Sequence, residues 1–266
     1  MSQCFRNEVL EYDNPLFLKC IDSCYIITMD GSDRRENYIQ QLDTYRPYKK
    51  VNIIHNKGYK KCTKDKSIQS TADDLSDVYA QIFYECLQNN NERVLILEDD
   101  FFFTEQFELL RQDIAEIESF ILNTPKLMTY NLGAIPWIMH PCSANMKHYW
   151  YKGCIAHSVI YSQAYMTEYI KHYKTMSCLS DTFWNKYKQN YCFYKAICFQ
   201  LFPRTENSKI WSKYIDFVGI KQKVFDADKT HEHLYPFMYN FAKSWYMFVI
   251  LFIIYKVKYF KKSNSI

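Results

Sequence analysis

The stretch VLILEDDFFF (Val94–Phe103) sets four aliphatic residues directly before three acids and three phenylalanines. A continuous apolar run of this kind is typical of a strand that is buried on both faces, as in a parallel sheet. A carboxylate is costly to remove from water without a partner, so three acids at the end of such a strand need an explanation. Open α/β sheets bind their ligands at the carboxyl ends of their strands. The stretch therefore predicts a central strand with a functional site at its end.

The segments around this strand alternate between predicted strands and helices, which is the pattern of an α/β fold. The clearest helix begins near Leu75, where apolar residues recur at the spacing of an amphipathic helix, and ends at Asn89; Thr71, Asp73 and Asp74 are its candidate caps. Strands are also predicted at 24–29, 51–54, 127–132 and 154–161, helices at 32–42, 105–122, 163–173 and 181–188, and a further apolar run at 196–202.

The chain has 266 residues, of which 48% are hydrophobic, so it can bury a sizeable core. Because the sequence contains neither an internal repeat nor a clean linker, we expect one domain at 21–236. We expect residues 1–20 to be a loosely structured lead-in, 57–66 to be a solvated lysine-rich loop, and 237–266 to be a hydrophobic tail flanked by lysines.

Charge and cysteine usage exclude some classes of function. The 33 basic and 29 acidic residues leave a net charge of +4 without a basic face, so nucleic-acid binding is not expected. The ten cysteines include no CxxC pair, and Cys24, Cys86, Cys154, Cys178 and Cys198 lie singly in apolar segments, which favours buried free thiols over disulfides. The first thirty residues lack a signal-peptide pattern, so we expect a location on the cytoplasmic side.

The acidic triplet suggests a metal site. Successive side chains of a strand alternate between its faces, so Glu98 and Asp100 are expected to point to one face and Asp99 to the other. Two converging carboxylates repel each other unless a proton or a cation lies between them, and Mg²⁺ or Mn²⁺ accepts such ligands. The alternative is that the acids cap a helix that begins near Thr104.

Several further stretches resemble glycosyltransferase family 25, the lipopolysaccharide and collagen galactosyltransferase type, and are most similar to its members from large DNA viruses. VLILEDDFFF looks like the family's LEDD element, its version of the DxD metal motif. The other stretches that carry the resemblance are CYIITMDGSDRRENYIQQL (24–42), GCIAHSVIYSQAYM (153–166), LSDTFW (179–184) and YKAICFQLFPRTENSKIW (194–211). Together they cover residues 24–212 in the family's order.

The resemblance implies a GT-A fold, a Rossmann-like mixed sheet flanked by helices that binds a nucleotide sugar, and a location in a host cell if the chain is viral. It implies transfer of a hexose, with a UDP-sugar favoured, to a glycan or protein hydroxyl, with Mn²⁺ or Mg²⁺ as cofactor. Asp100 and Glu98 are then the expected metal ligands, with Asp99 supporting them. Thr28, Asp30 and Arg34 or Arg35 are expected to face the nucleotide and its phosphates, and Asp99 belongs to the same predicted nucleotide-sugar-binding group. The alternative for the two arginines is a solvated helix face.

The resemblance also implies an inverting reaction, which requires a carboxylate to accept the proton of the acceptor hydroxyl. Asp181 is the candidate base because it matches the family's downstream acidic site. A helix N-cap is the rival role for Asp181. His231 and His233 are candidates to complete the metal sphere, His233 being the predicted third ligand, although both also fit surface positions. We expect His157 to be an interior histidine or to line the pocket.

The tail contains a charge-free run, Ser244–Tyr255, between Lys243 and four further lysines. Twelve residues are fewer than the roughly twenty that span a bilayer, so we expect residues 237–262 to lie on a membrane surface with lysines at anionic headgroups. The alternative is a terminal helix packed on the domain or on a partner.

Two other functions stay open. The helix before the triplet lacks the Gly-x-x-x-Ser-His element of the family, which is compatible with a catalytically inactive GT-A-like protein that binds glycans or serves in assembly. A different metal-dependent phosphoryl-transfer or hydrolytic enzyme is the other alternative, although the sequence offers no nucleophile motif for it.

Overall fold

The computed structural model describes residues 4–15, 18–103, 107–175, 180–201 and 234–263. Its main feature is a nine-stranded mixed sheet of order β1-β3-β2-β4-β9-β6-β10-β8-β7, and a two-stranded sheet pairs β11 with β5. The prediction of an α/β fold built on a mixed sheet flanked by helices is confirmed. The strands are β1 (Phe5–Glu11), β2 (Ser23–Met29), β3 (Lys50–Asn56), β4 (Arg93–Glu98), β5 (Phe101–Phe103), β6 (Thr129–Asn131), β7 (Ile135–Pro141), β8 (His148–Cys154), β9 (Ser158–Ser162), β10 (Asn190–Phe193) and β11 (Cys198–Gln200).

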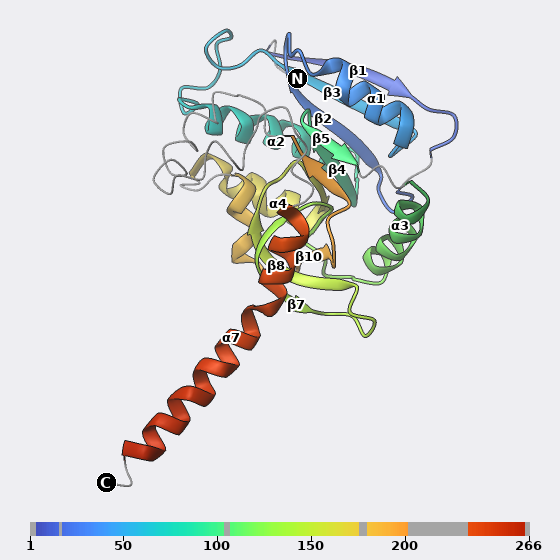
Figure 1. Cartoon of the computed structure of the whole chain (residues 1–266). Helices are drawn as coiled ribbons and strands as arrows, with labels where there is room; N and C mark the ends of the chain where they lie inside the picture. The colour runs from blue at the N-terminus through green and yellow to red at the C-terminus, as the bar shows by residue number, and fades with distance from the viewer. Residues whose placement is uncertain (1–3, 16–17, 104–106, 176–179, 202–233, 264–266) are drawn as a thin grey trace.

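Helices cover both faces of the sheet (Figure 1). One face packs against α1 (Arg35–Tyr45) and α3 (Phe107–Leu122), and the other against α2 (Thr71–Gln88), α4 (Gln163–His172) and the 3-10 helix η2 (Ser180–Lys186). A short 3-10 turn, η1 (Tyr173–Thr175), follows α4. A third cluster joins β7 and β8 to the start of α7 (Leu234–Ser263).

Strand β4 is the centre of this arrangement. It runs parallel to β2 on one side and antiparallel to β9 on the other. All four of its aliphatic residues, Val94 to Leu97, are fully buried, two in each of the face clusters. The prediction of a central strand buried on both faces is therefore confirmed, and the burial explains why the run has no polar residue before Glu98.

The best-predicted helix, α2, is held at its start by a capping box. The Ser70 hydroxyl accepts from the backbone N–H of Asp73, and the Asp73 carboxylate accepts from the backbone N–H of Ser70. Ser70 is thus the N-cap, one residue before the predicted cap candidates. The helix presents its apolar side, including Val78, Ile82 and Phe83, to the sheet.

The structure corrects the expectation for residues 1–20. Phe5–Glu11 forms strand β1, which pairs antiparallel with β3 at the edge of the sheet. Most of its side chains are at least partly exposed, as in FRNEVLE, so the segment shows no continuous apolar run. An edge strand needs burial on only part of its surface, which is why composition did not reveal it.

The predicted strand at 154–161 is wrong in its bounds. Strand β8 ends at Cys154 and β9 begins at Ser158, and Ile155 between them has a φ of 79°. The chain thus leaves one strand and enters another that runs in the same direction, with β10 and β6 between them in the sheet. The hairpin of β7 and β8 (Ile135–Cys154) was not predicted either.

Two cysteines contradict the expectation of free thiols. Cys4, just before β1, forms a disulfide with Cys62 in the loop after β3. Cys24, Cys86, Cys154 and Cys198 are free and buried as expected, and Cys178 lies outside the described residues. The disulfide fastens the edge of the sheet to a loop at the carboxyl end of β3.

Helix α7 holds the predicted tail. Its first part packs on the domain and the remainder projects away from it (Figure 1). In the part of the chain that the structure describes, no helix combines the length and the apolar character needed to cross a membrane.

Candidate functional site

The order of the strands creates a switch point between β2 and β4. Strand β3 pairs with one edge of β2 and β4 with the other, so the connecting helices α1 and α2 lie on opposite faces of the sheet. The crevice at the carboxyl ends of two such strands is where open α/β sheets bind ligands. Here those ends are Thr28–Met29 and Glu98–Asp99, and the backbone N–H of Asp99 donates to the carbonyl of Ile27.

Asp99 is the hub of this crevice. Its carboxylate accepts hydrogen bonds from the hydroxyls of Thr28 at 2.7 Å and Ser32 at 3.0 Å, and from the guanidinium of Arg34 at 2.5 Å. The side chain of Asp99 is 9% exposed and that of Arg34 is 22% exposed. These three donors, one of which is the arginine of a partly buried ion pair, hold the carboxylate of Asp99 in one position. The structure therefore brings Thr28, Arg34 and Asp99 together.

Asp100 is buried beside Asp99 but has a different environment. Its Oδ2 accepts from the side-chain amide of Gln200 at 3.0 Å, and its backbone carbonyl accepts from Leu201 N–H. Within the described residues, its buried Oδ1 has no hydrogen-bond partner. Burial, followed by the charge of Asp99, raises the pKa of Asp100 to about 7. Asp100 is thus a buried carboxyl group with one amide donor on Oδ2 and, in the part of the chain that the structure describes, no ion-pair partner.

Glu98 and Asp100 accept hydrogen bonds from different side chains, Tyr79 and Gln200. Strand β4 ends at Glu98, and Asp99 and Asp100 form a turn. The alternation of side chains between the two faces therefore does not continue to Asp100, so Glu98 and Asp100 are not aligned on one face. The Glu98 carboxylate instead accepts a 3.0 Å hydrogen bond from the hydroxyl of Tyr79 on α2. The premise of one extended strand through the triplet is therefore wrong.

Asp30 and Arg35 are held elsewhere by β1. The guanidinium of Arg35 lies 2.5 Å from Glu8, and Asp30 lies 3.5 Å from Arg6. All of these groups except Glu8 are well exposed. Arg34 and Arg35, which the sequence could not distinguish, thus point to different partners: Arg34 to the crevice and Arg35 to the edge strand.

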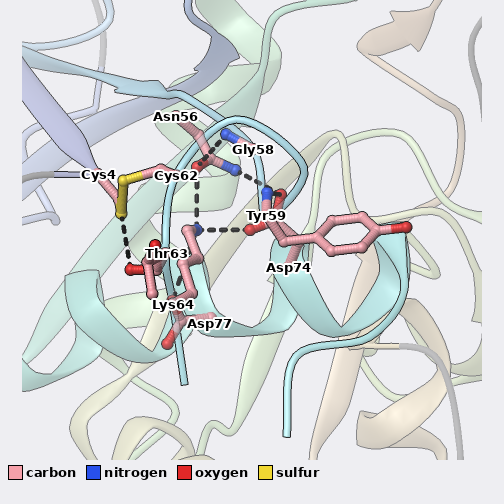
Figure 2. Close-up of a disulfide and its surroundings, with 9 residues drawn as sticks. All are labelled: Cys4, Asn56, Gly58, Tyr59, Cys62, Thr63, Lys64, Asp74 and Asp77. Atoms are coloured by element: carbon pink, nitrogen blue, oxygen red, sulfur yellow. Dashed lines mark hydrogen bonds and ion pairs between the residues drawn. A yellow bond between two sulfur atoms is a disulfide. The ribbon is translucent and has the colours of Figure 1, made fainter. Parts of the chain in front are cut away.

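The loop after β3 begins at the same end of the sheet, because β3 runs parallel to β2, and Figure 2 shows the residues that hold it. A Cβ added to Gly58, whose φ is 77°, would lie 2.9 Å from the terminal methyl of Met29. The loop is held by the Cys4–Cys62 disulfide and by Lys64, whose Nζ donates to Asn56 at 3.0 Å and to Asp74 at 2.5 Å. The side chain of Lys64 is only 4% exposed, so the expectation of a wholly solvated loop is wrong at this residue.

Asp74 connects this loop to α2. Besides Lys64, its carboxylate accepts from the side-chain amide of Asn56 at 3.0 Å and from the backbone N–H of Tyr59 at 3.3 Å. The carboxylate is 6% exposed, and Asp77 lies 3.6 Å from the same ammonium group. Burial raises the pKa of Asp77. The network fixes the loop at the border of the crevice.

The other predicted residues lie apart or outside the described part. Asp181 is in η2, although its side chain lies outside the described residues, as do His231 and His233. His157 is completely buried, and its Nε2 donates to the carbonyl of Cys198 at 3.3 Å. Burial lowers the pKa of His157 to about 4, so it is a neutral histidine in the interior. This agrees with the first of the two expectations, an interior histidine.

The fit of a divalent ion can be judged from the donors present. Among the described residues, no group of three or more His, Cys, Asp and Glu side chains is placed to hold a metal ion. The Asp99 oxygens are already used by Thr28, Ser32 and Arg34, whereas Oδ1 of Asp100 is buried and unpartnered within that part of the chain. Asp100 therefore fits as one oxygen ligand, with the remaining ligands left to water, substrate or residues outside the described ranges.

Three residues of the crevice were not predicted: Ser32, Tyr79 and Gln200. Ser32 and Gln200 lie within stretches that resemble family 25, but no role was assigned to them. Tyr79 carries a hydroxyl on the buried side of an amphipathic helix, where a partner is needed. That requirement is the sequence signal that points to a buried polar contact, although it does not identify Glu98.

Comparison with solved structures finds several similar chains, and two of them illustrate the low level of similarity. One is a glycosyltransferase involved in the glycosylation of the major capsid of PBCV-1, with 9% identity over 74% of this chain and 100% of that one, at a TM-score of 0.39. The other is mannose-1-phosphate geranyltransferase from Thermus thermophilus, with 14% identity over 56% and 52% of the two chains, at a TM-score of 0.29. At these TM-scores neither likeness bears on what this site does.

The sequence comparisons found no match. No protein-family model matches the chain, and no curated protein matches it. The family of the chain is therefore not established, and its resemblance to family 25 stays a prediction.

Proposed function

We propose that this chain is a glycosyltransferase that moves a hexose from a nucleotide sugar to a glycan or protein hydroxyl. The observation that carries the proposal is the pair Asp99–Asp100 at the end of the buried strand β4, beside Arg34 and the end of β2. A crevice at such a switch point is a binding site for a nucleotide, and its one unpartnered buried carboxylate oxygen among the described residues favours a cationic ligand.

In this proposal the two acids have separate roles. Asp99 holds Arg34, Thr28 and Ser32 in place, and Arg34 is the donor available to a phosphate oxygen because part of its guanidinium is exposed. Asp100, oriented by Gln200, faces the divalent ion that accompanies the diphosphate. A bound Mn²⁺ or Mg²⁺ would supply Lewis-acid stabilisation of the departing diphosphate.

The loop after β3, Asp181 and His233 have the remaining roles in the proposal. Lys64, Asn56 and Asp74 fix the loop at the border of the crevice, so it is a preformed wall for the nucleotide. Asp181 is the proposed base for the acceptor hydroxyl, which would give an inverting reaction. His233 stays a proposed metal ligand. A UDP-sugar is the favoured donor, on the resemblance to family 25.

A second function is favoured by two observations. Asp99 is already neutralised by Arg34, and the described residues contain no set of three metal ligands. Both facts suit a protein that keeps the fold of a glycosyltransferase and binds a glycan or nucleotide sugar without transfer. This alternative predicts binding of a donor without its turnover.

The test is hydrolysis of a panel of UDP- and GDP-sugars in the presence of Mn²⁺, measured as the amount of nucleotide released. We expect one donor to be hydrolysed by the native chain, and the rate to fall at least a hundredfold in Asp100→Asn. Asp65→Asn, at an exposed loop position, is the matched control and should keep the native rate. Binding of a donor without turnover would favour the inactive protein, and absence of both would contradict the proposal.

A further inference from the structure

Helix α7 changes its surroundings after its first ten residues, a third of its length. Tyr235, Tyr239 and Ala242 are buried in the cluster formed with β7 and β8. The Lys243 ammonium donates to the carbonyl of Tyr194 at 2.6 Å and lies 5.4 Å from the ring of Tyr149. From Ser244 onward, no described side chain of the helix is buried. The helix is therefore fixed to the domain by its first ten residues and projects beyond them (Figure 1).

The projecting part is apolar on every side. Leu251 to Tyr255 are five consecutive residues, each between 46% and 62% exposed. Successive residues of an α-helix are about 100° apart, so these five cover its whole circumference. Trp245 and Phe248 extend the apolar surface toward the domain. A helix that is hydrophobic all round is stable only when it is surrounded by other apolar groups.

The charges around this helix have one sign. Residues 234–266 contain five lysines and no acidic residue, whereas the whole chain has a net charge of +4, so residues 1–233 carry −1. The β7–β8 hairpin, against which α7 packs, also contains two lysines, Lys147 and Lys152, and no acid. Its Trp137 and Met146 are 51% and 55% exposed. The two neighbouring elements thus share exposed apolar groups and positive charge.

We propose that α7 from Ser244 onward inserts into a lipid bilayer that carries anionic headgroups, with the β7–β8 hairpin resting on the bilayer surface. Acyl chains surround an inserted helix on all sides, which matches its apolar circumference. Anionic headgroups attract clustered lysines next to such a segment. A second copy of the chain fits less well, because a paired helix needs one apolar stripe and would bring two lysine clusters together.

The length of the helix sets the depth of insertion. The charge-free run from Ser244 to Tyr255 has twelve residues and is about 18 Å long at 1.5 Å per residue. The hydrocarbon core of a bilayer is about 30 Å thick. Lys256 follows directly and is exposed, and its long stem allows its ammonium to reach the headgroups. The run therefore lies obliquely within one leaflet.

The test is sedimentation of the full chain with vesicles of phosphatidylcholine alone or with 30% phosphatidylserine, chosen here as the anionic lipid. We expect binding to the anionic vesicles that weakens as salt rises. In Leu251→Glu/Phe252→Glu, binding should be lost. In a variant with Lys256, Lys258, Lys261 and Lys262 changed to Gln, affinity should fall on the order of fivefold per lysine.

Leu122→Glu is the matched control, because Leu122 is 59% exposed at the end of α3, outside the proposed face, and its substitution should leave binding unchanged. Circular dichroism and a thermal melt establish that each variant is folded. Light scattering measures the mass of the native chain in detergent and without lipid. We expect the mass of a monomer, because detergent then covers α7. A dimer that resists detergent and ignores vesicles would overturn the proposal in favour of a second copy. Equal binding to neutral vesicles, or binding that survives Leu251→Glu/Phe252→Glu, would also overturn it.

Discussion

The guanidinium of Arg34 lies 2.5 Å from the carboxylate of Asp99, although 65 residues separate them in the chain. The next residue, Arg35, makes an equally short contact with Glu8 on the edge strand. Two adjacent arginines thus serve two different parts of the molecule. This division allows the role of the crevice to be tested against a neighbouring residue of the same type.

Replacing Arg34 with Gln should impair both stability and donor use. The substitution removes the charged partner of a nearly buried carboxylate, which costs about 2 kcal/mol in the free energy of unfolding. Donor turnover should fall at least tenfold, because Asp99 loses its partner and a phosphate loses a donor. Urea unfolding and donor hydrolysis measure the two effects.

Arg35→Gln is the control for that substitution. Arg35 is exposed and Glu8 is partly exposed at the edge of the sheet, and ion pairs at the surface contribute at most about 1 kcal/mol. Donor turnover should stay within about twofold of the native rate. If both arginine variants lost turnover to the same extent, the special position of Arg34 would be disproved.

The disulfide between Cys4 and Cys62 should contribute substantially to stability. It closes a loop of 58 residues, and restricting the unfolded chain in this way is worth about 3 to 4 kcal/mol. Urea unfolding of Cys4→Ser should show this loss. Dithiothreitol should lower the urea midpoint of the native protein to that of the variant. Cys142→Ser, at an exposed free cysteine, should have no such effect. A native midpoint that does not respond to the reductant would contradict the assignment.

Lys64→Met tests the network that holds the loop after β3. Methionine retains the apolar stem beside Phe5, whose ring lies 4.1 Å from the ammonium, but leaves Asp74 as a buried charge. Breaking a buried ion pair in this way costs about 3 kcal/mol. Adding Asp74→Asn should restore part of the loss, because the charge is then absent. Lys61→Met, in the exposed part of the same loop, is the control.

If the double variant were no more stable than Lys64→Met, the ion pair would not be the reason for the loss. Equilibrium unfolding of the four proteins, native, two single variants and the double variant, gives the coupling energy directly.

His157 should make stability depend on pH. Its folded pKa is lowered to about 4 by burial, against about 6.5 in an unfolded chain, so the unfolded state binds the proton first as pH falls. The neutral histidine contributes fully to the free energy of unfolding above pH 6.5. This contribution, about 3 kcal/mol in all, is lost progressively as the pH falls toward 4. Unfolding of native protein and His157→Gln across this range measures it. The variant should show a flatter profile than the exposed-site control His172→Gln.

The sequence predicted the centre of the fold well because its signals there were local. Burial of β4 and of one side of α2 leaves a regular pattern of apolar residues within each segment: four consecutive aliphatic residues in β4 and amphipathic spacing in α2. Strand β1 could not be predicted, because its alternating FRNEVLE residues are mostly exposed at an edge. The same applies to the β7–β8 hairpin, where Pro136 and Pro141 interrupt the pattern.

The missed strand explains the errors at the site. Thr28, Arg34 and Asp99 were predicted as one group and lie together. Asp30 and Arg35 were predicted with them but contact Arg6 and Glu8, both on β1. The partners of a side chain depend on strands that are distant in sequence, so an edge strand that is not predicted leaves its partners unassigned. The contact between Gln200 and Asp100 spans 100 residues and has the same cause.

The most direct test of the proposed site is calorimetric titration of UDP and GDP into the full chain in the presence of Mn²⁺, with Asp100→Asn and Asp65→Asn alongside. We predict that one nucleotide binds the native chain and the exposed-site control Asp65→Asn with equal affinity, that binding requires Mn²⁺, and that Asp100→Asn weakens it at least tenfold. Binding that is equal in Asp100→Asn and in the native chain, or no binding of either nucleotide, would contradict a nucleotide site at the end of β4.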